Sequence, residues 1–313
     1  MFDVPILFIV FNRPNITKLV FDRIRQIKPK YLFIHADGPR SWIHDDLLFS
    51  LEVRAIVSNI DWECDVKKTF HTENYGCGKA VSSAISWFFE HVDEGIILED
   101  DCLPDLSFFS FCKENLAKHR DDRRIMHISG NNFHPLKRIN EYSYYYSKYN
   151  HIWGWATWKK SWDSYKFNID TGDISKQISS RKYPLGSHRY WKSIFLQTSM
   201  GSIDTWDYQW TYAMWKEGGL AIIPKYNLIS NIGFGANATH TNDEDSYLSN
   251  LPVRPIEFPL VHPPTVSVSW LADWMVSKKH FNVRFFKNRF LNKFFILFFC
   301  LIYFFVYRKI DFK

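Results

Sequence analysis

The stretch Gly95-Ile-Ile-Leu-Glu-Asp-Asp101 is the most informative part of this 313-residue chain, because an apolar run ends there in three consecutive acids. A short apolar run of this kind, with β-branched residues, is typical of a buried strand. Open α/β sheets bind ligands at the carboxyl ends of their strands, and carboxylate oxygens suit Mg²⁺ and Mn²⁺. The sequence therefore predicts a metal-assisted phosphate site at Glu99, Asp100 and Asp101.

Outward from this strand, the first 130 residues alternate between strand and helix patterns. Strands are expected at 5–11, 31–35, 65–70, 96–98 and 125–129. The first helix is expected after a cap at Asn15, with an apolar stripe of Ile16, Leu19, Val20 and Ile24. Further helices are expected at 45–57, 79–91 and 107–118. Strands separated by helical crossovers form parallel sheets with right-handed connections. We expect the α/β class, with a mostly parallel, Rossmann-like sheet.

Composition and cysteine spacing indicate a folded protein of a reducing compartment. Hydrophobic residues make up 46% of the chain and aromatic residues 18%, which is ample for a core. The five cysteines form no CxxC pair, so neither a zinc site nor a disulfide framework is indicated. No basic segment precedes the first apolar run, which is therefore interpreted as a strand and not as a signal peptide. We expect a cytoplasmic protein.

Positive charge is concentrated in residues 278–313, which hold nine Lys and Arg against one acid, a net of +8. The other 277 residues hold 30 Lys and Arg against 32 Asp and Glu, a net of −2, which argues against nucleic acid as a partner. The basic segment also contains the apolar run 294–307. These fourteen residues would form a helix of about 21 Å, shorter than the roughly 30 Å hydrocarbon core. We expect a basic and apolar helical tail lying at the inner face of the cytoplasmic membrane, with a C-terminal core helix as the alternative.

Gly76-Cys-Gly78-Lys79 precedes a predicted helix but matches no common nucleotide motif. It lacks the third glycine of a dinucleotide fingerprint, and a P-loop needs Gly in place of Glu73 and Ser or Thr in place of Ala80. The N–H groups of a helix N-terminus favour an anion, so a bound phosphate or sugar is one interpretation. A tight turn between strand and helix is the other.

Further short motifs are spread over residues 4–245 in a definite order. They are Phe8-Ile-Val-Phe-Asn-Arg-Pro14, Ala36-Asp-Gly38, Asn74-Tyr-Gly-Cys-Gly78, Leu98-Glu-Asp-Asp101, Trp153-Gly-Trp155, Thr205-Trp-Asp207, Pro224-Lys-Tyr-Asn-Leu-Ile-Ser-Asn231, Gly233-Phe-Gly235 and His240. In this order they resemble the A-type-fold nucleotide-sugar glycosyltransferases, and in particular the inverting N-acetylglucosaminyltransferase I family, whose acidic motif is also Glu-Asp-Asp. The tail lies outside the resemblance. Animal members of the family carry their membrane anchor at the other end of the chain, so the C-terminal position of this tail suggests a bacterial-type enzyme.

The resemblance implies roles for individual residues. Asp101 is expected to contact a Mn²⁺ or Mg²⁺ ion, while Glu99 and Asp100 orient the ribose and the sugar. His240 and the loop 233–235 are expected to close over the diphosphate or to ligate the metal. The donor nucleotide is expected at Phe11, Asn12, Arg13, Asp37, Asn74, Gly76, Gly78 and Lys79.

An inverting transfer needs a base beside the acceptor hydroxyl. The resemblance places this base after the Trp of a Trp-Asp motif, which is Asp207. Asp204 is the nearby alternative, and a purely structural helix cap is the alternative role for Asp207. Trp153, Trp155 and Trp158 are candidates either for stacking on an acceptor sugar or for the core.

These observations together predict one catalytic domain, 1–277, in which residues 1–141 bind the nucleotide-sugar and residues 142–277 form the acceptor half. The expected activity is metal-dependent transfer of a hexosyl or N-acetylhexosaminyl group from a nucleotide diphosphate donor, with a UDP-sugar favoured, to a glycan or lipid-linked acceptor in polysaccharide biosynthesis. One alternative is a nucleotidyltransferase acting on a sugar phosphate, which is expected to carry a Gly-rich basic loop after its first strand. The other is a non-catalytic sugar-binding or membrane scaffold protein.

Overall fold

The computed structural model describes residues 1–133, 140–170, 174, 182–184, 186–235, 246–281 and 283. The first half alternates strands and helices: β1 (Ile6–Val10), α1 (Pro14–Ile27), β2 (Tyr31–Ala36), α2 (Asp46–Ser58), β3 (Asp65–Phe70), α3 (Cys77–Phe89), β4 (Glu94–Glu99), β5 (Cys102–Pro104), α4 (Ser107–His119) and β6 (Ile125–Ser129). The second half contributes β7 (Tyr144–Ser147), β8 (Trp155–Trp158), α5 (Lys159–Trp162), α7 (His188–Ser199), α8 (Asp207–Glu217), β9 (Leu220–Pro224), β10 (Ile229–Asn231) and α9 (Trp270–Lys279).

These elements form a mixed α/β fold around an eight-stranded sheet of order β3-β2-β1-β4-β8-β6-β9-β7. Only β8 and β7 run antiparallel to their neighbours, so the predicted mostly parallel sheet is confirmed. Strand β8, from the second half, lies between β4 and β6 of the first. The two predicted halves of the chain therefore share one sheet. A second, two-stranded sheet pairs β10 with β5.

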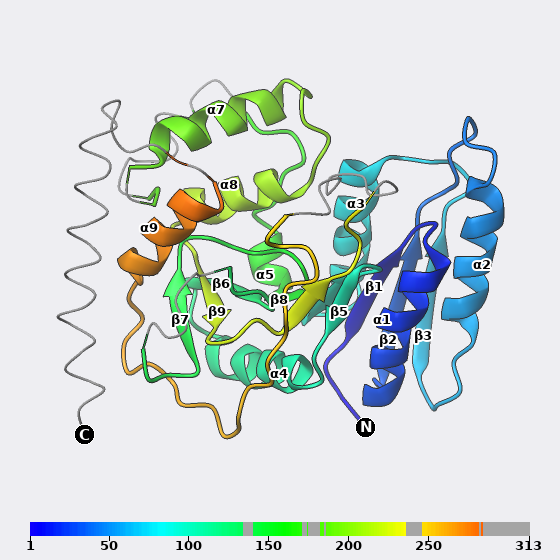
Figure 1. Cartoon of the computed structure of the whole chain (residues 1–313), viewed down its shortest axis with the longest axis horizontal. Coiled ribbons are helices and arrows are strands. Elements are labelled where there is room, and N and C mark those ends of the chain that lie inside the picture. Colours follow the sequence, from blue (N-terminus) through cyan, green and yellow to red (C-terminus); the bar gives the residue numbers. More distant parts are fainter. Residues whose placement is uncertain are drawn as a thin grey trace.

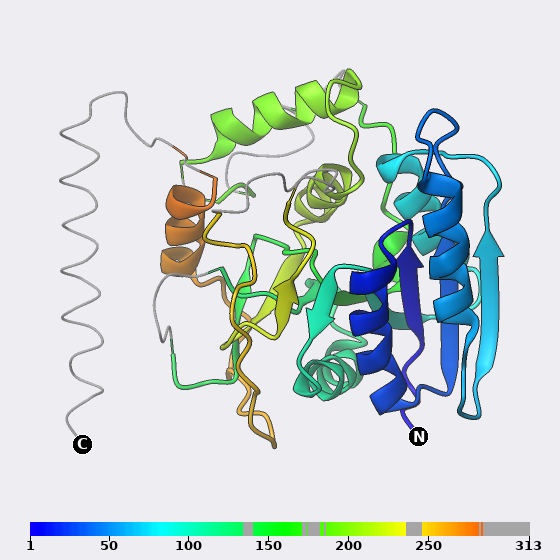
Figure 2. The ribbon, with the colours of Figure 1, turned by 45° about the vertical axis from the view of Figure 1, so that its right-hand side comes forward.

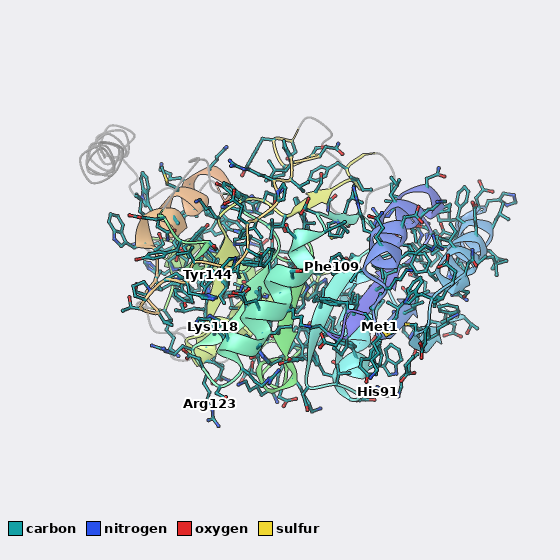
Figure 3. The ribbon with its side chains drawn as sticks, turned by 90° about the horizontal axis from the view of Figure 1, so that it is seen from below. Met1, His91, Phe109, Lys118, Arg123 and Tyr144 are labelled. Carbon is teal, nitrogen blue, oxygen red and sulfur yellow. The ribbon has the colours of Figure 1, made fainter. Side chains whose placement is uncertain are left out.

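Helices cover both faces of the large sheet (Figures 1 and 2). Alternate residues of β1 point to opposite sides, as a strand requires. Ile6 and Phe8 belong to a core shared with α1, α2 and α4, whereas Leu7 and Ile9 belong to a core shared with α3, α7, α8 and α9. Figure 3 views the molecule from below, the end from which the chain enters β1. The site lies at the other end of the strands.

Each predicted strand and helix of the first 130 residues is present, with ends within about two residues of the expected ones. Two details were wrong. Helix α1 begins at Pro14, with Arg13 as its N-cap and no capping side chain, because proline suits the first helical position; Asn15 is therefore not the cap. Leu19, placed in the apolar stripe, is 51% exposed, whereas Thr17 is buried.

The C-terminal part of the described chain ends soon after α9. This helix packs on β7 and runs to Lys279, past the predicted boundary between residues 277 and 278. The Asp273 carboxylate fixes it by accepting hydrogen bonds from the Ser147 hydroxyl at 2.5 Å and the Lys148 N–H at 3.0 Å. Within the ranges described, no helix is long and apolar enough to cross a bilayer. The apolar run 294–307 lies outside them.

Candidate functional site

Three neighbouring strands end at one edge of the sheet, and the predicted site residues follow them. Strand β1 ends at Val10, β2 at Ala36 and β4 at Glu99. The register pairs Val10 with Ala36 and Ile9 with Glu99, so the three ends lie side by side. This carboxyl edge is where open α/β sheets bind their ligands.

Two cavities open at this edge, one of about 560 Å³ and one of about 270 Å³. Both are lined by Arg13, Cys77 and Glu99. The smaller cavity is also lined by the predicted residues Phe11, Asn12, Asp37, Asn74, Gly76 and Asp100. The larger one is lined by Asp101 and Asp207. Gly78 and Lys79 line neither cavity. Apart from Gly78 and Lys79, the predicted donor residues therefore lie on adjoining cavities, together with Asp101 and Asp207.

Arg13 bonds two of the three acids of the triplet, Asp100 and Asp101. Its Nη2 donates hydrogen bonds to Asp100 Oδ1 and, at 3.1 Å, to Asp101 Oδ2, and its Nε lies 3.4 Å from Asp100 Oδ2. Burial opposes the guanidinium charge, but Asp100 and Asp101 raise the pKa of Arg13 above its usual value. Asp100 is only 3% exposed, so its charge depends on this partner.

Glu99 has no such partner among the described residues, and it lies beside two acids. Burial, followed by the repulsion of Asp101 and then Asp100, raises the pKa of Glu99 to about 8, with Arg13 opposing the shift. One guanidinium cannot balance three ionised carboxylates, and this favours the protonated form of Glu99. A bound cation at this point would lower that pKa and favour release of the proton.

Asp37, predicted near the base or ribose, organises the loop before α3. Its Oδ1 accepts the N–H groups of Gly38 at 2.9 Å and Tyr75 at 3.0 Å, and its Oδ2 accepts Gly76 N–H at 3.2 Å and Asn74 Nδ2 at 3.0 Å. Burial raises the pKa of Asp37, and the backbone N–H groups oppose the rise. The carboxylate thus fixes the wall of the smaller cavity.

The N-terminus of α3 already receives a carboxylate from within the chain. Asp204 Oδ1 accepts the Gly78 N–H at 3.2 Å, and a Cβ at Gly78 would lie 2.6 Å from that oxygen and 3.0 Å from Thr205 O. Gly76 has φ of +79°, the left-handed region that favours glycine. Lys79 is exposed. The two glycines therefore allow close contact between α3 and the segment before α8.

Asp207 is the first residue of α8 and lines the larger cavity with Asp101. The Thr205 hydroxyl donates a hydrogen bond to Asp207 Oδ1. The N-cap of α8 is Trp206, so Asp207 is not the capping residue. Trp206 stacks on Trp155 with ring centroids 5.6 Å apart, which anchors the start of the helix in the core.

The three candidate stacking tryptophans differ in position. Trp153 lines the larger cavity. Its ring packs edge to face on Phe133 and on Phe234, with ring centroids 5.0 and 5.7 Å apart. Trp155 and Trp158 are 0% and 2% exposed and belong to the core. Only Trp153 of these three is placed to contact a ligand.

The glycine loop after β10 lies against the acidic group. A Cβ at Gly233 would lie 2.6 Å from Arg13 Nη1 and in contact with Asp101. Glycine is therefore required for the backbone to cover this pair. His240, predicted to close over the diphosphate, lies outside the described residues.

Sequence reasoning missed two polar residues of the larger cavity. Asn150 and the buried His151 line it, and neither Asn150 Nδ2 nor His151 Nε2 has a hydrogen-bond partner in the part of the chain described. The Thr211 hydroxyl donates to Asn150 Oδ1 at 2.8 Å, and the His127 ring and the Ser129 hydroxyl bond to the His151 carbonyl at 3.0 and 2.6 Å. No motif marks these residues, because only the fold brings them together.

The smaller cavity also contains unpredicted residues. His35 is 1% exposed, its Nε2 lies 3.0 Å from His71 Nε2, and burial followed by His71 lowers the pKa of His35 to about 4. The guanidinium carbon of Arg40 lies 5.3 Å from the centroid of the Phe11 ring, a cation–π contact. At the junction, burial and then Glu99 raise the pKa of the Cys77 thiol.

The acidic residues at this edge fit a metal ion whose remaining ligands are waters and substrate oxygens. Across the described residues, no group of three or more His, Cys, Asp or Glu has the geometry of a metal cage. Mg²⁺ in phosphate sites, however, is commonly held by one or two carboxylates together with waters and substrate phosphates. Asp101, on the cavity wall beside Glu99, fits that arrangement.

Comparisons with known proteins do not assign the chain to a family. No protein-family model and no curated protein matches it. Among solved structures, it is similar to 4-diphosphocytidyl-2C-methyl-D-erythritol synthase from Anaerococcus prevotii DSM 20548, with 8% identity, a TM-score of 0.29, and coverage of 51% of this chain and 73% of that chain. A similarity of this size supports neither a shared fold nor a shared activity.

Proposed function

We propose that the chain is a metal-dependent, inverting glycosyltransferase of the A-type fold, similar to the N-acetylglucosaminyltransferase I family. It would transfer a sugar from a nucleotide diphosphate donor, with a UDP-sugar favoured, to a glycan or lipid-linked acceptor. The observation that carries this proposal is the pair of adjoining cavities at the carboxyl edge of the sheet. A donor lying across their junction would have its nucleoside in the smaller cavity and its sugar in the larger one.

The smaller cavity provides a suitable nucleoside site. Phe11 and Arg40 form an aromatic and cationic pair on its wall. Asn12 and Asn74 carry amide oxygens that can accept hydrogen bonds from a base or ribose, since their Nδ2 groups bond Asp46 and Asp37. Asp37 acts here as a positioning residue, because its oxygens accept N–H groups of the chain. Arg13, on both cavities, lies where the diphosphate would cross.

Asp101 would hold Mn²⁺ or Mg²⁺ together with oxygens of the donor diphosphate. The bound ion supplies Lewis-acid neutralisation of the charge that develops on the leaving diphosphate. Arg13 supplies a second, fixed positive charge, bonded to Asp101 at 3.1 Å. His240 remains a predicted additional ligand.

Asp207 would act as the base on the acceptor side. Its carboxylate takes the proton from the acceptor hydroxyl, whose oxygen forms the new bond to the anomeric carbon. The bond from that carbon to the diphosphate oxygen breaks, and the nucleoside diphosphate leaves with the electron pair. Because attack and departure occur on opposite faces, the product has inverted configuration. Asp204 is less suited, since it bonds the α3 N-terminus.

The connection after β1 favours this activity over nucleotidyl transfer. The chain passes from Val10 through Phe11, Asn12 and Arg13 directly into α1, and no Gly-rich loop is present there to cradle a triphosphate. The two activities release different products. Incubation with UDP-sugars should release UDP, whereas incubation with UTP and sugar phosphates should release no pyrophosphate. The reverse pattern would replace the proposal by nucleotidyl transfer, and the absence of both products would favour a non-catalytic protein.

We further propose that the enzyme is peripheral at the inner face of the cytoplasmic membrane, held by the basic and apolar segment 278–313. The support for this is the sequence alone, with its charge of +8 beside an aromatic-rich apolar run. Removal of residues 284–313 should release the enzyme from membranes while donor hydrolysis persists. A truncated protein that stays on the membrane would contradict this role for the tail.

A further inference from the structure

Five large apolar residues are exposed in the first half of α2 and in the turn before it. Trp42 is 72% exposed, Ile43 41%, Leu47 57%, Leu48 63% and Leu51 55%. We call these five residues the α2 patch. Leu47 and Leu48 lie four and three positions before Leu51, so the three leucines share one face of the helix.

This face is the outer side of α2. The buried residues Ser50, Val53 and Val57 lie on the inner side, which packs beside α1, and α2 forms the right-hand edge of the molecule in Figure 1. Exposed helix faces are normally polar. Summed, the exposed fractions of the α2 patch equal about three whole residues, on the order of 600 Å² of surface. A typical monomer has no larger apolar patch than about 300–600 Å².

Charge around the α2 patch indicates which partner it suits. Segment 40–58 carries Arg40 and Arg54 against Asp45, Asp46 and Glu52, a net of −1. Both arginines are engaged within the chain: Arg40 Nη2 bonds Asp46 Oδ1 at 2.8 Å, and Arg54 bonds the carbonyls of the segments after β2 and β3. An anionic lipid surface is bound by Lys and Arg around an apolar face, which this segment does not offer.

We propose that the α2 patch is the contact surface between two copies of this chain, paired about a two-fold axis with α2 antiparallel to its copy. In such a pairing each patch meets the same patch, so apolar area faces apolar area without a second complementary surface. The area of about 600 Å² approaches the roughly 800 Å² that each partner contributes to a stable interface. Antiparallel helices also place opposite dipole ends together.

The proposal does not depend on the enzymatic activity, and the test uses the full-length chain. Sedimentation velocity over a range of concentrations would compare the native protein with Leu48→Glu and Leu51→Glu. The matched control is Leu19→Glu, which places the same charge on a leucine of α1 that is 51% exposed and outside the α2 patch. All variants keep the same tail, so association through the tail is common to all of them.

The native protein and Leu19→Glu are expected to be dimeric. Each Glu in the α2 patch enters the interface twice and should raise the dimer dissociation constant by about 100-fold or more, with no change in far-UV circular dichroism. A native protein that is monomeric throughout the concentration range, or patch variants that dimerise like Leu19→Glu, would overturn the proposal. Leu48-dependent binding of a monomer to phosphatidylcholine–phosphatidylglycerol vesicles would assign the α2 patch to a membrane instead.

Discussion

Replacing Asp207, at the start of α8, by Asn should lower kcat without changing the stability of the protein. Asparagine keeps the side-chain oxygen that accepts the Thr205 hydroxyl, so the fold at this point should be retained. It removes the carboxylate that lines the larger cavity and is proposed to accept the proton. Loss of a general base lowers kcat by about 10²- to 10⁴-fold, which is about 3–5 kcal/mol of barrier. Donor KM should change little, because the nucleoside is proposed to lie in the other cavity.

Asp204→Asn is the matched control, because the same chemical change falls on a carboxylate with a different contact. Asp204 bonds Gly78 N–H at the N-terminus of α3, and it is exposed to solvent. Removing its charge should cost only about 0.5–1 kcal/mol of stability, as expected for an exposed anion at a helix N-terminus. Its kcat should stay within about threefold of the native value.

The assay is UDP release from the active donor in the presence of acceptor, with Tm recorded for each variant. The reasoning predicts a large fall in kcat with unchanged Tm for Asp207→Asn, and a small fall in Tm with unchanged kcat for Asp204→Asn. Exchange of these two patterns would refute the assignment of the base.

Three further changes have defined outcomes. Asp101→Ala should lower turnover by about 10²- to 10³-fold and abolish the response to Mn²⁺ while Tm is retained, because it removes the carboxylate proposed to hold the ion; a variant that still responds to Mn²⁺ would contradict this role. Gly78→Ala should destabilise the protein by about 1–3 kcal/mol in urea unfolding, since its Cβ would lie 3.0 Å from the Thr205 backbone oxygen and would displace the Asp204 carboxylate from the Gly78 N–H; unchanged stability would contradict this close contact of α3. Burial raises the pKa of Asp273 to about 6, so the folded state binds this proton more tightly, and the contribution of Asp273 to stability, about 3 kcal/mol, should be lost as the pH rises from about 4 through 6; the native protein should therefore lose stability relative to Asp273→Asn over this range, and a constant difference between the two would contradict the shift.

The first half of the fold was predictable because each element there is local. A parallel strand buried on both faces is a continuous apolar run, as in β4, and the helices between strands carry their own periodicity. Asp207 and Asp101 were also accessible to sequence reasoning, since each belongs to a short motif. The structure places both on one cavity.

The rest of the site depends on contacts between distant parts of the chain. Nothing in the sequence pairs Asp204 with Gly78, yet this contact fixes the N-terminus of α3. Trp153 and Trp155 similarly differ in burial, although both belong to one alternating run. Strand β8 lies between β4 and β6, which buries Trp155, whereas Trp153 precedes the strand. His151 has no motif and enters the larger cavity only through the fold.

We propose that the residues of the adjoining cavities catalyse transfer of a sugar from a nucleotide diphosphate donor. The most direct measurement is nucleoside diphosphate release from a panel of nucleotide-sugars, each incubated with the full-length protein in Mn²⁺ and in excess EDTA. The proposed site predicts release from at least one donor, with a UDP-sugar favoured, in Mn²⁺ and its loss in EDTA. Release from no donor in Mn²⁺ would contradict the proposed activity, and equal release in EDTA would contradict the metal site at Asp101.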